Sequence, residues 1–388
     1  MIDPAVSGAE FVRRCEALVP ALAERAEEAE SLRRLPDETM LDARDSDLFG
    51  VVVPTSLGGQ GLGLDALAQG TRTLAHGCVA SAWTLSFLML HGWLLSRFPA
   101  EAREELFAGG SVPLTPAPLA PTGSVRPVEG GFRLSGRWEW ATGVAHSDWV
   151  MVHAVQSEPS FAMWFAVVPR DQVQVDDVWF TSGMRATGSN TVRIDDVFVP
   201  AHRAVASQSM LLAAEPLDGD GLAHHPVPAV LALVAAAPAL GAAEAAVELY
   251  RRRLGERVLA YTLGDRAAEQ PAAQVRLATA MSDLSAARVR WDTAITDLVG
   301  ACADGAPGEA LRVDIRLAAA ATVRSSRGVI STVCEGAGAS VYFSDAPLQR
   351  LQRDVEVLKG HVIFDWDRTA ELAGRYALGF PLRPTDMV

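Results

Sequence analysis

The segment Arg353-Asp354-Val355-Glu356-Val357-Leu358-Lys359-Gly360-His361 tells most about this chain. It follows the glycine-rich segment Glu335-Gly336-Ala337-Gly338-Ala339 in a region that is rich in Ala and Leu. Segments this long and nearly free of Pro predict antiparallel helices in a bundle. We expect four of them, at residues 229–254, 270–298, 309–334 and 348–377. His361, at the end of the segment, is a group that can take up or donate a proton near neutral pH.

Upstream, from Val112 to about Pro200, the pattern changes to β-rich runs separated by Gly, Pro, Asp and Ser. Such runs predict an antiparallel sheet or a small barrel. The four clearest runs are residues 134–140, 149–155, 161–168 and 192–199.

Residues 1–112 are predicted to be helical. Pro36-Asp37 indicates a helix start, and residues 65–75 and 81–97 predict two further helices. The second of these is apolar on all sides, which predicts that it is buried. We therefore expect an α+β chain with a helical domain at 1–112, a β domain at 113–222 and a helical domain at 223–388.

Composition excludes several classes of function. The 388 residues carry a formal charge of −13, which argues against nucleic acid or an anionic membrane as partner. The four cysteines have no metal-site spacing, so we expect no metal and a reducing compartment. Residues 1–30 are rich in Glu and Arg, which is not the pattern of a secretory signal. The apolar stretch Ser81–Leu95 is interrupted by His91 and is expected to be too short to span a bilayer, so a cytoplasmic protein is expected. The sequence has no G-x-G-x-x-G motif after a strand and no Walker motif, so we expect no dinucleotide site of the Rossmann type.

Five segments in order resemble the acyl-CoA dehydrogenase superfamily along essentially the whole chain. They are Pro54-Thr-Ser-Leu-Gly-Gly-Gln-Gly-Leu62, Leu134-Ser-Gly-Arg-Trp-Glu-Trp-Ala-Thr-Gly143 with Asp148-Trp149, Gly183-Met-Arg-Ala-Thr-Gly-Ser-Asn190, Glu335–Ala339 and Pro347-Leu-Gln-Arg-Leu-Gln-Arg-Asp354. The resemblance implies an acyl-CoA dehydrogenase-like fold: an N-terminal helical domain, a middle antiparallel β-barrel or sheet, and a C-terminal four-helix bundle.

Within the superfamily, the dehydrogenases carry a glutamate base just past the Arg-Asp pair. Here the available positions are His361 and Val362, and neither is a carboxylate. Together with the details around Ser135-Gly-Arg-Trp138 and Arg185–Ser189, this resembles the two-component flavin-dependent monooxygenase branch, which includes hydroxyphenylacetate hydroxylase oxygenases. In that branch an NAD(P)H-dependent flavin reductase supplies FMNH2 or FADH2. The flavin forms a C4a-hydroperoxide with O2 and transfers one oxygen atom to a small molecule, here expected to be aromatic or polycyclic.

The resemblance implies two catalytic residues. His361 is expected to act as a hydrogen-bonding or acid–base group at the flavin and substrate. The alternative is a helix-surface or core histidine held by a backbone carbonyl. His91 is polar within an apolar helix, so it either faces a pocket or has a dedicated partner.

Cofactor contacts are implied in the same way. Trp140 and Thr142 are expected beside the isoalloxazine, with Thr142 hydrogen-bonding N5; the alternative is a core Trp and a turn Thr. Further expected contacts to the ring, the ribityl chain or the phosphates are Gly123, Ser124, Thr187, Ser189, Arg257, Arg266 and Gly336. The arginines are expected to reach the flavin of a neighbouring subunit in a homotetramer or dimer. The family's phosphate-binding Arg is missing in register, which favours a loosely held, diffusible reduced flavin.

Three rival functions remain open. One is an acyl-CoA or acyl-carrier dehydrogenase with a displaced base, for which Glu244 or Glu256 could serve. Another is an N- or S-oxygenase of an amino sugar or thioether. The third is a scaffold that has lost its flavin.

Overall fold

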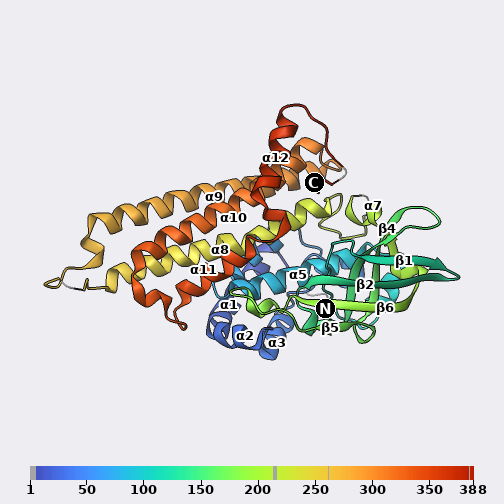
Figure 1. Cartoon of the computed structure of the whole chain (residues 1–388), viewed down its shortest axis with the longest axis horizontal. Helices are drawn as coiled ribbons and strands as arrows, with labels where there is room; N and C mark the ends of the chain where they lie inside the picture. Colours follow the sequence, from blue (N-terminus) through green and yellow to red (C-terminus); the bar gives the residue numbers. More distant parts are fainter. Residues whose placement is uncertain (1–5, 213–215, 261, 384) are drawn as a thin grey trace.

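The computed structural model describes residues 6–212, 216–260, 262–383 and 385–388. Helices, a sheet and a second set of helices follow one another in the predicted order (Figure 1). The helices before the sheet are α1 (Gly8–Glu24), α2 (Ala26–Leu32), α3 (Asp37–Asp45), α4 (Leu64–Leu74), α5 (Val79–Ser96) and α6 (Ala100–Leu106). The start of α3 confirms the signal at Pro36-Asp37.

Helix α5 is buried along its whole length, as its uniformly apolar sequence predicts. By length and composition alone, α5 and the later helix α8 (Val227–Glu256) could each cross a membrane. However, 100% and 89% of their most apolar windows are buried inside the fold. The expectation that the α5 segment is too short to span a bilayer was therefore wrong, and it is burial that identifies α5 as a core helix.

The sheet has the strand order β5-β6-β2-β1-β3-β4-β7. Its strands are β1 (Gly123–Val128), β2 (Gly131–Ala141), β3 (Trp149–Gln156), β4 (Ala162–Pro169), β5 (Gln174–Asp176), β6 (Asn190–Pro200) and β7 (Ala204–Ala206). The pairings between these strands are antiparallel except that β1 and β3 run parallel. The prediction of an antiparallel sheet needs that correction, and the sheet continues past Pro200 to β7. Helix α7 (Ser207–Leu211) follows.

The C-terminal bundle extends away from the sheet (Figure 1). Helix α8 packs there with α9 (Pro271–Ala303), α10 (Glu309–Ala337) and α11 (Pro347–Leu358). Pro271 and Pro347 stand at the first turn of their helices, where the missing N–H leaves no hydrogen bond unmade. These four helices agree with the expected four-helix bundle.

The predicted helix over 348–377 is broken in the structure. Helix α11 ends at Leu358, and α12 (Trp366–Ala377) begins after a single turn, η8 (Val362–Phe364). Gly360 weakens helix continuation, and the Asp365 side chain accepts a hydrogen bond from the Arg368 N–H, which caps the new helix. His361 therefore lies in the break between two helices and not on a helix surface.

Candidate functional site

Four aromatic rings form a row that starts on α5 and ends at His361. Trp83, Phe87 and His91 recur every four residues and so share one face of α5. The ring centroids of Trp83 and Phe87 are 4.8 Å apart, and those of Phe87 and His91 are 5.5 Å apart. The His361 ring meets Trp83 edge-on at 5.6 Å. The two predicted catalytic histidines thus stand at opposite ends of one row of rings. We call His361, Trp83, Phe87 and His91 the ring row.

His361 is exposed, although the surrounding protein desolvates its ring. This desolvation and, second, the nearby Arg316 guanidinium lower its pKa to about 4. The His361 Nδ1 accepts a hydrogen bond from the Ile363 N–H at 3.3 Å. The neutral ring therefore carries its hydrogen on Nε2.

His91 has the opposite tautomer. Its Nδ1 lies 2.7 Å from the carbonyl oxygen of Thr115, which can only accept, so Nδ1 carries the hydrogen and Nε2 is left as an acceptor. Burial lowers the pKa of this ring to about 4, so it is neutral at pH 7. The dedicated partner expected for a buried histidine is thus Thr115. Asp148 fixes the adjoining chain, because its Oδ2 accepts from the Leu114 N–H at 2.8 Å.

Three predicted cofactor residues form a row of hydroxyl groups. The Thr142 Oγ1 lies 2.8 Å from the Ser189 Oγ, which lies 2.7 Å from the Thr187 Oγ1. Thr187 donates to the carbonyl oxygen of Met184 at 2.9 Å. We call Thr142, Ser189 and Thr187 the hydroxyl row. It joins the end of β2 to the loop 183–189, two segments that are distant in the sequence.

Gly143 connects the hydroxyl row to α5. Its N–H donates to the Thr187 carbonyl oxygen at 3.0 Å, and its φ is +75°. A Cβ at this position would lie 3.2 Å from Thr84 and 3.4 Å from Leu88 on α5. Thr84 and Leu88 are each one residue beyond Trp83 and Phe87, so their face adjoins the face that carries the rings. Gly143, next to the hydroxyl row, therefore packs against the face of α5 that adjoins the face carrying the rings.

Trp140 is not the core tryptophan of its strand. Its side chain is 60% exposed, whereas Trp138 is fully buried and donates from Nε1 to the His153 carbonyl oxygen at 2.7 Å. Trp140 has φ +64° beside a bulge in β2, an uncommon conformation for a large residue that costs about 1–3 kcal/mol. The alternative interpretation of Trp140 as a core residue is therefore wrong.

Gly123 and Ser124 do not join the hydroxyl row. A Cβ on Gly123 would lie 1.9 Å from the Trp138 ring, so the glycine is needed for that indole to pack. The exposed Ser124 hydroxyl donates to the Ser135 carbonyl oxygen at 3.4 Å. In the contacts that the structure describes, both residues contribute to packing and hydrogen bonding within the sheet.

Arg257, Arg266 and Gly336 gather at the end of the bundle that is remote from the sheet, where α8 and α10 end and α9 begins (Figure 1). Arg257 donates to the Ala337 carbonyl oxygen at 3.0 Å, and a Cβ on Gly336 would lie 2.4 Å from the Tyr250 hydroxyl. Within one chain these three residues are not brought to the hydroxyl row.

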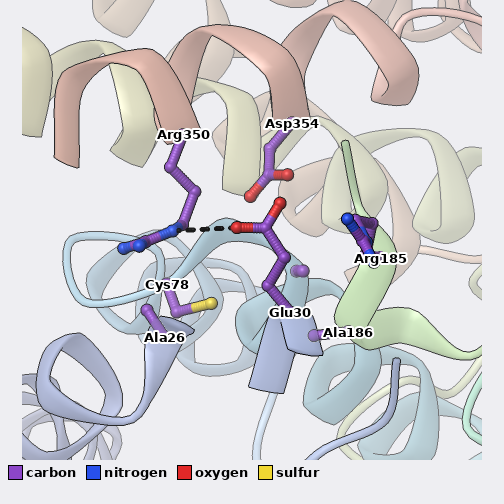
Figure 2. Close-up of a pocket in the computed structure, with 8 residues that line it drawn as sticks. Ala26, Glu30, Cys78, Arg185, Ala186, Arg350 and Asp354 are labelled. Atoms are coloured by element: carbon purple, nitrogen blue, oxygen red, sulfur yellow. Dashed lines mark hydrogen bonds and ion pairs between the residues drawn. The ribbon is translucent and has the colours of Figure 1, made fainter. Parts of the chain in front are cut away.

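Asp354 is a buried acidic residue that the sequence analysis did not propose for the site. Its Oδ1 accepts a hydrogen bond from the Met184 N–H at 2.5 Å, and burial raises its pKa to about 7. Figure 2 shows its carboxyl group facing that of Glu30, which is paired with Arg350 at 3.4 Å. A cavity of about 10 Å³ lies among these side chains, room for at most about one water molecule. The Arg-Asp pair was visible in the sequence, but its partner, 170 residues away, was not.

A cleft of about 590 Å³ lies between α1, the turn before α5, α8 and α11. None of the predicted site residues lines it. Glu244, one of the rival bases, lies at this cleft and bonds to His76 at 2.8 Å and to Arg288 at 2.8 Å. These partners, with Arg72, outweigh its burial and hold its pKa below the usual value. Glu244 is therefore an ion-paired carboxylate, which argues against it as a displaced base.

The cysteines are all free and buried, as expected for small hydrophobic residues. Burial raises the pKa of Cys302 and of Cys334 to about 11. In the described part of the chain, no group of three or more His, Cys, Asp or Glu side chains could hold a metal ion.

Known families match both helical regions. The acyl-CoA dehydrogenase N-terminal domain matches residues 11–107, and the acyl-CoA dehydrogenase C-terminal domain matches residues 233–366. The pigment production hydroxylase of a Rhodococcus species is 33% identical over 97% of this chain and 98% of its own length. The flavin-dependent monooxygenase oxygenase subunit HsaA of Rhodococcus jostii is 31% identical over 96% of this chain and 100% of its own.

The fold is also found among solved structures. XiaF from a Streptomyces species, in complex with FADH2 and glycerol, superposes with a TM-score of 0.90 at 28% identity. The superposition covers 97% of this chain and 96% of XiaF. The likeness thus extends over all three regions of the chain, the sheet included.

Proposed function

Because the chain belongs to the flavin-dependent monooxygenase branch of the acyl-CoA dehydrogenase superfamily, we propose that it is the oxygenase component of a two-component enzyme that hydroxylates a small aromatic or polycyclic molecule. A separate NAD(P)H-dependent flavin reductase supplies its reduced FMN or FAD. The observation that carries the proposal is that Gly143, next to the hydroxyl row, packs on α5 beside the face that carries the aromatic rings and His361.

The open end of the hydroxyl row fits a flavin ring. The half-buried Thr142 stands two residues from the exposed Trp140, so a polar group and a flat aromatic face are close together at the surface. The Ser189 hydroxyl group is hydrogen-bonded to that of Thr142, and the Thr187 hydroxyl group to that of Ser189. The bound flavin supplies the activation of O2. The chain contributes orientation, hydrogen bonds and exclusion of water.

The two histidines have complementary roles in this proposal. The unprotonated Nε2 of His91 accepts a hydrogen bond from a hydroxyl group of the substrate. The Nε2–H of His361 donates a hydrogen bond at the other end of the row. Trp83 and Phe87 lie between them and offer aromatic faces to a planar molecule. A hydrogen bond that draws the hydrogen of a phenol towards Nε2 makes the neighbouring ring carbons richer in electrons, which favours attack on an electrophilic oxygen.

The remaining expectations concern assembly and location. We infer a homotetramer or dimer in which Arg257, Arg266 and Gly336 of one subunit approach the flavin of another. Their place at the far end of the bundle supports this, because it leaves them far from the hydroxyl row of their own chain (Figure 1). We also propose the domain boundaries 1–112, 113–222 and 223–388 and a cytoplasmic location.

The test is to load the protein with reduced flavin without air, mix it with ¹⁸O2 and add phenols of increasing ring number. We expect the bound flavin to return to its oxidised form more slowly than free flavin, and one ¹⁸O atom to enter a product. Oxidation at the rate of free flavin, with no labelled product from any phenol, would refute the proposal. Bleaching of oxidised flavin by a CoA thioester would instead favour a dehydrogenase.

A further inference from the structure

The peptide group that joins Val362 to Ile363 is held from both sides. Its N–H donates to the His361 Nδ1 at 3.3 Å, and its carbonyl oxygen accepts from the Arg316 Nη2 at 3.2 Å. The carbonyl oxygen and the N–H of a trans peptide lie in one plane and point in opposite directions. Arg316 and the His361 ring therefore lie at opposite edges of one peptide group, and a turn of that group would break both hydrogen bonds.

Arg316 lies on α10, and its side chain is buried. Burial lowers the pKa of its guanidinium, because little water is left to solvate the charge. Its described hydrogen bonds go to two uncharged groups, the carbonyl oxygens of Val362 and, at 2.8 Å, of Met387. An apolar side chain would fill the same space without the cost of a buried charge. The hydrogen bonds of Arg316, more than its packing, therefore explain its presence.

The Met387 carbonyl group, which binds the other side of the guanidinium, is fixed through its neighbour Asp386. The Asp386 carboxylate accepts from the Arg375 Nη2 and from the Arg383 N–H, each at 2.7 Å. Arg375 belongs to α12, so the backbone at Met387 is tied to that helix. The guanidinium thus connects a fixed carbonyl group beside α12 to the turn η8 that follows His361.

The contact with Arg316 strengthens the contact with His361. A guanidinium that donates to a carbonyl oxygen polarises the whole peptide group, which makes its N–H a better donor. Because His361 accepts from this N–H, Arg316 favours the tautomer that has a bare Nδ1 and a hydrogen on Nε2. After desolvation, the Arg316 charge is the second cause that lowers the pKa of His361. Both effects leave the Nε2–H of a neutral ring as the group that His361 can donate.

We propose that Arg316 is a positioning residue that acts through the peptide group between Val362 and Ile363 and fixes the orientation and the Nε2–H tautomer of His361. The part of this inference that concerns the reaction rests on the proposed function. The contacts themselves do not, because all of them are made within this chain. One net hydrogen bond corresponds to roughly a 3- to 10-fold change in the ratio of the two tautomers.

The test labels the histidine side chains of the full chain with ¹⁵N. The ¹⁵N chemical shifts of the His361 ring, assigned from the signals that His361→Ala loses, show which nitrogen carries the hydrogen. In Arg316→Met the ratio of the Nε2–H to the Nδ1–H tautomer should fall roughly 3- to 10-fold. Arg97→Met is the matched control, because Arg97 also donates to two carbonyl oxygens, those of Met210 and His225. It should leave the His361 signals unchanged.

Two further variants separate the parts of the arrangement. Arg316→Lys keeps the positive charge but has one nitrogen in place of the planar guanidinium. The pKa of His361, read from the same signals, should therefore stay low in Arg316→Lys and rise in Arg316→Met. Asp386→Ala releases the backbone at Met387 and leaves Arg316 in place, so it should lower the tautomer ratio in the same direction and by less.

The yield of product per reduced flavin connects the tautomer to the reaction. It should fall in Arg316→Met and not in Arg97→Met. An unchanged tautomer ratio in folded Arg316→Met and Asp386→Ala would overturn the inference while the proposed function stands. An altered ratio with an unchanged yield would overturn the positioning role. If the unmodified protein oxygenated no phenol, the proposed function would fail, and the ¹⁵N shifts would still decide whether Arg316 sets the tautomer.

Discussion

The carboxylate of Asp354 on α11 holds the backbone N–H of Met184, across 170 residues of sequence. The backbones next to these two residues are also in close contact, because a Cβ on Gly183 would lie 2.2 Å from the Arg353 carbonyl oxygen. Met184 in turn accepts the hydrogen bond from Thr187 that ends the hydroxyl row. The Arg-Asp pair therefore positions the loop that carries Thr187 and Ser189, although it lies in the helical bundle.

Replacing Asp354 by Asn should remove a pH dependence of stability. The raised pKa, about 7, means that the folded protein retains a proton that the unfolded chain releases near the ordinary value of 3.8. Stability is therefore lost as pH rises from about 4 to about 7 and levels off above that. Urea unfolding between about pH 5 and pH 8 measures this. The free energy of unfolding of Asp354→Asn, relative to that of the unmodified protein, should rise with pH up to about pH 7 and then stay constant.

Asp354→Ala is the companion variant. Asn can still accept from the Met184 N–H, whereas Ala leaves that group unpaired and should be less stable than Asn by about 1–3 kcal/mol. Parallel stability curves for the unmodified protein and Asp354→Asn would show that this carboxyl group is already ionised in the folded state over that range.

His361→Ala should leave the protein folded and lower the yield of product per reduced flavin consumed. Because the pKa of His361 is lowered to about 4, the ring is neutral from about pH 6 to pH 8, and the yield should not change through protonation of His361 in that range. Below about pH 6.5 the unfolded chain takes up a proton at His361 that the folded protein does not. The free energy of unfolding therefore falls as pH falls from about 6.5 towards 4. An inflection in yield near pH 6.5 that disappears in His361→Ala would contradict the neutral ring.

Substitutions at His91 should show in unfolding experiments how much its hydrogen bond to the Thr115 carbonyl oxygen contributes to stability. His91→Phe leaves the Thr115 carbonyl oxygen without its donor and should cost about 1–3 kcal/mol. His91→Asn places an N–H at a similar distance from the backbone and should be less destabilising. Equal losses in the two variants would mean that the bond to Thr115 contributes nothing to stability.

Gly123→Ala should destabilise the sheet by about 1–3 kcal/mol, because its methyl group would overlap the buried Trp138 ring. Ser124→Ala, on the exposed side of β1, should change stability by less than about 0.5 kcal/mol. Thermal unfolding compares the two. A Gly123→Ala protein of normal stability that binds reduced flavin weakly would assign the glycine to the cofactor instead.

The sequence by itself determined the order of the elements and which of them are buried. Period-two alternation and period-3.6 spacing report local backbone geometry and burial, so the strands β2, β3, β4 and β6 and the core helix α5 were predicted close to where they lie. It also indicated Thr142, Thr187, Ser189 and His361 through resemblance. The break after Leu358 was missed, although Gly360 and the capping Asp365 were both visible.

Only the tertiary structure decided how these residues act. The tautomers of His91 and His361 depend on the carbonyl or N–H group that each ring meets, and the Thr187 end of the hydroxyl row depends on the Met184 carbonyl oxygen. Such contacts join segments from different elements, and their geometry is set by packing, about which a local pattern carries no information. For the same reason the pairing of Asp354 with Met184 appeared only once α11 was packed against the loop that it holds.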